Sequence, residues 1–221
     1  MAAGVASRRS GGFTSGFHEI DGEREISLRN DLETYFEKPC VAKPYASYFE
    51  ATVAEALTRA GIEFRYVDSS AWIRRIGEDP FFNEGEYVPD FVTRFMINGK
   101  VVVIEPHGGS FFAKKNERSE SIGPDGSTTP RVKETFYDKM ERFVKEKGEK
   151  LYTIVITNMT PETLSYNLKT RGVGKIADEV WHVPTPKNRH NAGSAPEKGD
   201  VDAVLEKLHG LQLRTYRREN D

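Results

Sequence analysis

The sequence has little cysteine, no long apolar run and no excess of charge of one sign. Cys40 is the single cysteine among 221 residues, so no internal disulfide can form and too few thiols are present for a zinc finger. No apolar run approaches the length of a membrane span, and residues 1–16 lack the apolar core of a signal peptide. We therefore expect an intracellular, soluble protein with no membrane partner.

The charge balance limits how the chain could bind nucleic acid. Lysine and arginine number 32 against 34 acidic residues, which gives a net charge of −2. Proteins that bind chiefly through phosphate contacts are often strongly basic. A nucleic-acid partner would therefore have to meet a local group of basic residues, not an overall positive charge.

Patterns of helix and strand are concentrated between residues 44 and 184. The run SYFEATVAEALTRAG predicts a helix with Ser47 as its N-cap and Gly61 at its end. The further elements are expected in this order: strands at 62–67, 87–97 and 100–106, a helix at 131–147, a strand at 151–157, a helix from Pro161 and a strand at 179–184. This order predicts an α/β domain with a mixed central sheet flanked by helices.

The two ends of the chain and residues 109–130 carry weaker patterns. Residues 1–43 are expected to be a partly disordered N-terminal extension, with a short helix around Leu28–Glu37. Residues 109–130 are polar and predict a long loop. Residues 185–221 predict a linker and a short C-terminal helix at about 200–209.

A hairpin is predicted at the centre of the sheet. Asn98-Gly99 between two strand-like runs favours a two-residue type I′ turn, which places Ile97 opposite Lys100. Counting outward from that pair in an unbroken register, Glu105 would face Val92 and His107 would face Asp90.

Alternation along the strands then brings three polar side chains together. Directly opposed residues share a face of the sheet, and successive residues alternate between the faces. Asp90, Glu105 and His107 are therefore expected on one face as near neighbours. Carboxylates at close range repel each other, and a bound Mg²⁺ or Mn²⁺ would relieve that repulsion. A neutral imidazole could orient or deprotonate an attacking water.

The helix before the first strand supplies a fourth candidate, Glu50. It lies at the edge of the apolar stripe that contains Val53 and Leu57, so it can reach the margin between helix and sheet. Glu55 falls almost on the opposite side and should face solvent. Ser47 and Glu50 also fit a capping box, so Glu50 could serve the helix start, with or without a role in catalysis.

FEATVAEALTRAGIEFRY, YVPDF and VVVIEPHG together resemble the PD-(D/E)XK endonuclease superfamily. The resemblance covers roughly residues 44–157 and implies a restriction-endonuclease-like αβββαβ core, with residues 44–184 as a nuclease-like domain. It implies that Asp90, Glu105 and the Pro106 carbonyl hold Mg²⁺ or Mn²⁺. Glu50 would hold a water on the cation, or a second cation. The implied activity is that of a magnesium-dependent endonuclease that hydrolyses phosphodiester bonds in DNA.

The chain departs from the superfamily pattern at the lysine of Glu-x-Lys, where it has His107. A histidine there is similar to variants among very-short-patch-repair-like and related homing endonucleases. His107 could fill the role of the lysine, or Lys133 or Lys139 could do so from the next helix. We favour His107, because both lysines could simply lie on a solvated helix face.

A basic segment follows the predicted site. Lys114, Lys115 and Arg118, together with Lys133, could contact a phosphodiester backbone, although a solvated loop is the commoner meaning of such a segment. Nucleases that cut both strands often act as symmetric dimers, so a homodimer stays open.

Each site residue also has a structural alternative. Asp90 after Pro89 could be a strand-entry residue, Glu105 could form a structural ion pair, and His107 before two glycines could belong to a loop. Two other functions stay open as well. One is a catalytically silent nucleic-acid-binding module of the same fold, and the other is a metal hydrolase of a small phosphate ester.

Overall fold

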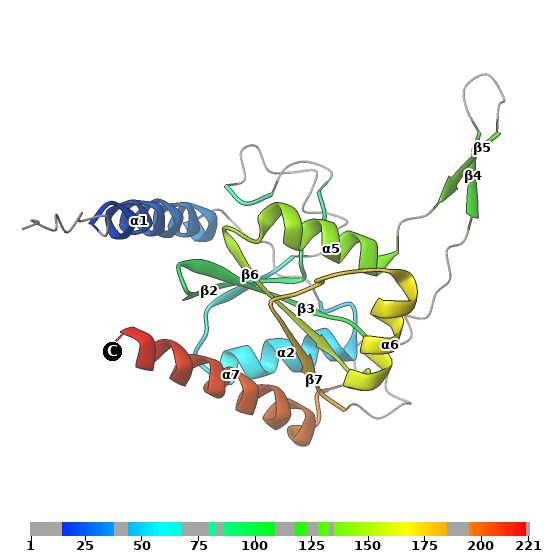
Figure 1. The fold of residues 1–221 in the computed structure, drawn as a ribbon. Coiled ribbons are helices and arrows are strands. Elements are labelled where there is room, and N and C mark those ends of the chain that lie inside the picture. Colours follow the sequence, from blue (N-terminus) through cyan, green and yellow to red (C-terminus); the bar gives the residue numbers. More distant parts are fainter. Residues whose placement is uncertain are drawn as a thin grey trace, which may run out of the picture.

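A five-stranded mixed sheet forms the centre of the molecule (Figure 1). The structure, a computed structural model, describes residues 15–37, 44–67, 80–82, 86–108, 118–122, 128–132, 135–184 and 195–219. The strand order is β1 (Phe64–Tyr66), β2 (Phe91–Ile97), β3 (Lys100–Pro106), β6 (Leu151–Thr157) and β7 (Glu179–His182). The first three strands are antiparallel and the last three are parallel, so β3 joins the two halves. The predicted α/β class and mixed sheet are confirmed.

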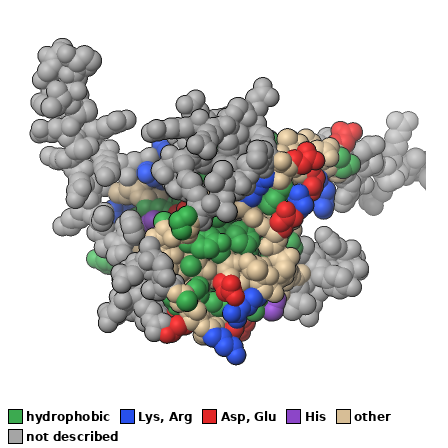
Figure 2. All heavy atoms as spheres, turned by 180° about the vertical axis from the view of Figure 1, so that it is seen from behind, with side chains coloured by type: hydrophobic (Ala, Val, Ile, Leu, Met, Phe, Trp, Pro, Cys, Tyr) green, Lys and Arg blue, Asp and Glu red, His purple; other side chains and the backbone are tan. Residues whose placement is uncertain are grey.

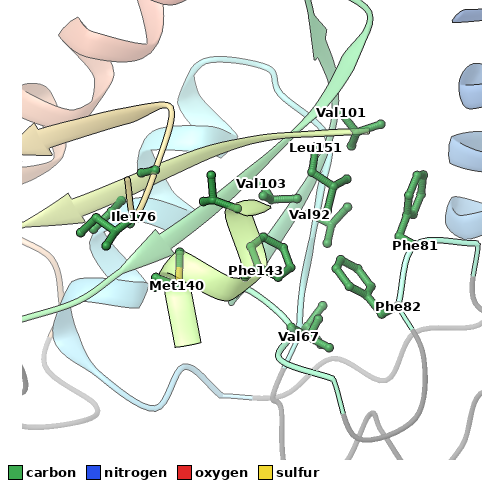
Figure 3. Close-up of a cluster of buried hydrophobic side chains, with 14 of the residues drawn as sticks. Val67, Phe81, Phe82, Val92, Val101, Val103, Met140, Phe143, Leu151 and Ile176 are labelled. Carbon is green, nitrogen blue, oxygen red and sulfur yellow. The ribbon is translucent and has the colours of Figure 1, made fainter. Parts of the chain in front are cut away.

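Helices cover both faces of this sheet. They are α1 (Ser15–Glu37), α2 (Tyr48–Arg59), α5 (Phe136–Lys147), α6 (Pro161–Arg171) and α7 (Lys198–Glu219). Buried side chains of α2 and α7 pack with Phe91, Val102 and Ile104 on one face. Buried side chains of α1, α5 and α6 pack with Val101 and Val103 on the other (Figure 3). Odd-numbered residues of β3 therefore face α1, α5 and α6, and even-numbered residues face α2 and α7.

Local signals set the ends of the helices that bound the site. The Ser47 side chain accepts a hydrogen bond from the Glu50 amide at the start of α2, as an N-cap should. After the end of α2, Gly61 has φ +67°, a left-handed conformation that glycine adopts without steric cost. Both boundaries agree with the sequence prediction.

The two outer helices are longer than predicted. α1 begins at Ser15, well before Leu28, although none of residues 22–27 is buried. Ion pairs between Arg29 and Glu25 (2.6 Å) and between Arg24 and Glu149 (3.0 Å) accompany this exposed part, which has no apolar period for a sequence pattern to detect. α7 runs from Lys198 to Glu219, and its buried stripe continues past residue 209 to Leu211.

The loop predicted at 109–130 contains a hairpin instead. β4 (Arg118–Ile122) and β5 (Thr128–Val132) pair in antiparallel fashion and stand away from the main sheet (Figure 1). Arg131 and Val132 belong to β5, so the helix predicted from residue 131 begins at Phe136. Its start is fixed by a reciprocal capping box between Thr135 and Asp138.

No helix in the described ranges combines the length and the apolar character that a membrane crossing requires. On the described part of the face in Figure 2, acidic and basic side chains lie next to one another. On this surface, too, positive and negative side chains are mixed, as the near-neutral net charge of the sequence suggests.

Candidate functional site

The β2–β3 hairpin has the predicted turn but not the predicted register throughout. Asn98 and Gly99 have φ values of 53° and 66°, and Ile97 pairs with Lys100, as expected for the two-residue turn. Farther from the turn, Val92 pairs with Val103. The prediction that Glu105 faces Val92 is therefore wrong.

A bulge in β2 causes this difference. Between Val92 and Met96, β2 has three residues where β3 has one, Val102, so the register moves by two residues. The Thr93 hydroxyl donates to the Val102 carbonyl (2.8 Å) and accepts from the Phe95 amide (3.3 Å). A side chain thus bonds backbone groups where the regular ladder is interrupted.

The shift brings Asp90 opposite Glu105, so His107 does not lie directly opposite Asp90. The Asp90 amide donates to Glu105 Oε2 at 3.0 Å. A shift by two residues keeps every side chain on its original face, because the side chains of a strand alternate with a period of two. Asp90 and Glu105 therefore remain neighbours, as predicted, but Glu105 now lies opposite Asp90 and not opposite Val92.

Glu105 is a buried carboxylate with few partners of opposite charge. Its residue is 4% exposed, and its Oε1 lies 3.5 Å from His107 Nδ1. Among the described residues, His107 is the only basic side chain that pairs with Glu105, and Lys139 forms no ion pair with it. Among the described residues, the Glu105 carboxylate thus has one backbone amide, one imidazole and the Tyr87 hydroxyl as its polar neighbours.

Tyr87 adds a phenol to the same region. Burial raises the pKa of Tyr87 well above its ordinary value of 10.0, and the charge of Glu105, a hydrogen bond to Glu105 and the charge of Asp90 raise it further. The phenol therefore stays neutral at all ordinary pH values.

His107 is fixed at both its backbone and its ring. Its amide donates to the Ile156 carbonyl of β6 at 2.8 Å. Its ring lies parallel to that of Phe136, with centroids 3.7 Å apart and an interplanar angle of 5°. The imidazole therefore has Glu105 at one edge and a phenyl ring against one face.

Glu50 reaches the region from the α2 side of the sheet. It is 9% exposed and accepts hydrogen bonds from the Ala46 amide (2.8 Å), the Ser47 hydroxyl (3.0 Å) and the Tyr66 hydroxyl. The predicted cap is present in a modified form, because the carboxylate bonds the amide of Ala46 and not that of Ser47. Glu50 therefore does serve the helix start, as its structural alternative proposed.

Tyr66 connects Glu50 with Asp90. Burial raises the pKa of Tyr66 far above its ordinary value, the hydrogen bond to Glu50 adds to the shift, and the charge of Asp90 contributes as well. The Tyr66 ring packs against Phe91, the residue that follows Asp90, with centroids 5.3 Å apart. The Tyr66 phenol thus bonds the Glu50 carboxylate and is also affected by the charge of Asp90 at the start of β2.

The oxygen donors match the chemistry of a hard divalent cation. Mg²⁺ commonly takes one or two protein carboxylates and keeps water in its remaining positions, which suits Asp90 and Glu105 with the Pro106 carbonyl. In the described ranges no group of three or more histidine, cysteine, aspartate or glutamate side chains is arranged to hold a metal ion. A cation at this position would therefore have to rely on two carboxylates, a carbonyl and water.

The predicted nucleic-acid contacts cannot be placed. Lys114, Lys115 and Lys133 lie outside the described residues. Arg118 begins β4, but its side chain also lies outside what the structure describes.

Three residues of the region were missed by reasoning from the sequence: Tyr66, Tyr87 and Phe136. Tyr66 could have been found from its place in a strand next to the Asp90 strand. Tyr87 and Phe136 reach the site through tertiary contacts that no local pattern encodes.

Comparison of the chain with protein-family models, with curated proteins and with solved structures finds no match. The geometry of the site therefore carries the functional argument.

Proposed function

We propose that the chain is a divalent-cation-dependent endonuclease that hydrolyses phosphodiester bonds in DNA, with a restriction-endonuclease-like core. The observation that carries the proposal is the buried Glu105 carboxylate, which contacts the Asp90 amide at 3.0 Å and His107 Nδ1 at 3.5 Å. Its polar neighbours among the described residues are this amide, this imidazole and the Tyr87 hydroxyl, and a cation beside it would offset the cost of burying its charge.

The arrangement of elements supports the fold part of this proposal. The chain passes from α2 through the antiparallel strands β1, β2 and β3, and then through α5 to β6, which lies parallel to β3. This is the αβββαβ order that the PD-(D/E)XK resemblance implies. Asp90 precedes β2 and Glu105 lies near the end of β3, the two positions at which that resemblance puts acidic ligands.

In the proposed mechanism, Asp90, Glu105 and the Pro106 carbonyl would hold Mg²⁺ or Mn²⁺. When bound, the cation stabilises negative charge on the phosphate and makes water more acidic. His107 accepts a proton from the attacking water as its oxygen bonds to phosphorus. The bond from phosphorus to the leaving oxygen breaks, and that oxygen takes up a proton from solvent.

Glu50 has a more distant role in this scheme. Its carboxylate already accepts three hydrogen bonds, and it stands next to Tyr66 on the α2 side. We propose that it holds a water near the cation, as the resemblance implies, while it also fixes the first turn of α2.

Cleavage of supercoiled plasmid DNA with Mg²⁺, and without it, tests the proposal. Wild type should cleave only with the cation, Asp90→Asn and Glu105→Gln should not cleave, and Glu55→Gln should cleave like wild type. Glu55 is the matched control because it lies on α2 and, among the described residues, forms its one ion pair with Arg59 at 2.9 Å on the surface. Absence of Mg²⁺- or Mn²⁺-dependent cleavage by wild type would refute the proposal.

One observation favours a second candidate, a silent nucleic-acid-binding module. Glu105 pairs with His107 where the superfamily pattern has a lysine. Wild type that shifts duplex DNA in a gel but does not cleave it with Mg²⁺ or Mn²⁺ would identify this alternative. If wild type hydrolyses a small phosphate ester in the presence of the cation but leaves plasmid DNA uncleaved, the chain is a phosphoesterase instead.

A further inference from the structure

We infer that Phe136 is a positioning residue, which holds the His107 ring so that its Nδ1 stays directed at Glu105. This inference rests on the proposed function, in which His107 accepts the proton of the attacking water. It adds a residue of α5 that neither the sequence pattern nor the resemblance assigned.

The contact geometry restricts both side-chain rotations of His107. The face of the imidazole lies against the Phe136 ring at 3.7 Å between centroids and 5° from parallel. The Nδ1 edge lies 3.5 Å from Glu105 Oε1. One contact on the face sets the plane of the ring, and the other on the edge selects which nitrogen points toward the carboxylate.

The backbones on both sides of the stack are also fixed. The His107 amide is bonded to the Ile156 carbonyl of the neighbouring strand at 2.8 Å. Phe136 is the first residue of α5, directly after the cap at Thr135. The Thr135 amide donates to Asp138 Oδ2 at 2.9 Å, and the Thr135 hydroxyl accepts from the Asp138 amide. Phe136 therefore presents its ring from a helix start that is held in place.

The orientation of the imidazole decides which nitrogen can act as the base. A proton on Nδ1 that faces the Glu105 carboxylate leaves Nε2 as the basic nitrogen. If the ring turned by half a revolution about the Cβ–Cγ bond, Nδ1 would change places with Cδ2 and Nε2 with Cε1, so a carbon would face the carboxylate and the basic nitrogen would leave its position. Phe136 opposes this rotation because the parallel stack permits it only after the two rings separate.

Steady-state cleavage by substituted proteins tests the inference. Phe136→Leu removes the flat face and should lower kcat by about tenfold with KM within about twofold of wild type, because substrate binding is unaffected. Phe136→Trp keeps a flat ring and should retain most of kcat. Phe143→Leu is the matched control on the same helix, since it removes a buried ring of the core (Figure 3) that is not in the stack. Its kcat should stay at the wild-type value.

A second measurement is independent of activity. The ring protons of His107, assigned by their loss in His107→Gln, should resonate at high field in wild type because they lie over the Phe136 face. They should move to low field in Phe136→Leu and stay in place in Phe143→Leu.

The outcomes separate this inference from the proposed function. Unchanged kcat in Phe136→Leu, or the same loss in Phe143→Leu, overturns the inference while the nuclease stands. Wild type without cation-dependent cleavage overturns the proposed function, and the catalytic meaning of Phe136 with it, even where the resonances show the stack. If Phe136→Leu lowers kcat and moves the His107 resonances to low field, while Phe143→Leu does neither, both the inference and the proposed function are supported.

Discussion

The two buried glutamates of the site, Glu50 and Glu105, differ in what surrounds their carboxylates. Glu50 accepts hydrogen bonds from a backbone amide and two hydroxyls, and it lies at the start of a helix, where negative charge is favoured. Among the described residues, Glu105 accepts one backbone hydrogen bond, lies 3.5 Å from one imidazole and has the Tyr87 hydroxyl beside it. Three donors hold Glu50 at the start of a helix, whereas the proposed function assigns the remaining acceptor capacity of Glu105 to a cation. Burial of an acidic residue is thus a weaker sign of catalysis than the number of donors that surround it.

The largest effect should come from Glu105. Glu105→Gln keeps the shape but removes the charge that would hold the cation, so kcat/KM for DNA cleavage should fall by roughly two to three orders of magnitude. Mn²⁺ binding measured by calorimetry should be lost in parallel. Normal Mn²⁺ affinity in Glu105→Gln would contradict this contrast, because Glu105 would then have a structural role like that of Glu50.

Glu50→Gln should act more on stability than on activity. The amide cannot accept all three hydrogen bonds, so the free energy of unfolding in urea should fall by about 2 kcal/mol, with an activity loss of about tenfold. Glu55→Gln on the same helix should change the free energy of unfolding by less than about 0.5 kcal/mol. A loss of activity in Glu50→Gln as large as that in Glu105→Gln would show that the two carboxylates work as equals.

The buried phenol beside Glu105 should make the protein sensitive to alkali. The pKa of Tyr87 is raised in the folded state above its ordinary value of 10.0. The unfolded chain therefore loses this proton first, and stability that is fully present below about pH 10 should decline as the pH rises beyond it. Urea titrations across this range should show a smaller decline in Tyr87→Phe. An equal decline in both proteins would indicate that neither burial nor the carboxylates raise the pKa of this phenol.

The smallest effect is expected from the bulge. Thr93→Val removes two hydrogen bonds to backbone groups, so the free energy of unfolding should fall by about 1 kcal/mol. Cleavage well below the melting temperature should remain close to wild type, because Asp90 and Glu105 stay on one face. A large loss of cleavage would mean that the altered pairing beside Val92 is needed for the site itself.

Short-range patterns sufficed for part of the fold and of the site. The Asn98-Gly99 turn, the Ser47 cap and the alternation in β3 each depend on residues close in the chain. The turn and the alternation were enough to predict that Asp90 lies near Glu105. The bulge was not predictable, because it depends on a bond from Thr93 to Val102 across the hairpin. Phe136 was not predictable because its ring meets His107 through a tertiary contact that no local pattern encodes.

The position of β3 between an antiparallel and a parallel neighbour has a consequence for the order of folding. The hairpin with β2 closes through a two-residue turn, while the pairing with β6 joins strands that are far apart in the chain. The β2–β3 hairpin should form sooner than the β3–β6 pairing, because less chain entropy is lost in closing its short loop. We therefore expect the acidic pair to assemble before the imidazole is anchored to Ile156. Pulse-labelling hydrogen exchange should then find the Asp90 amide protected earlier during refolding than the His107 amide.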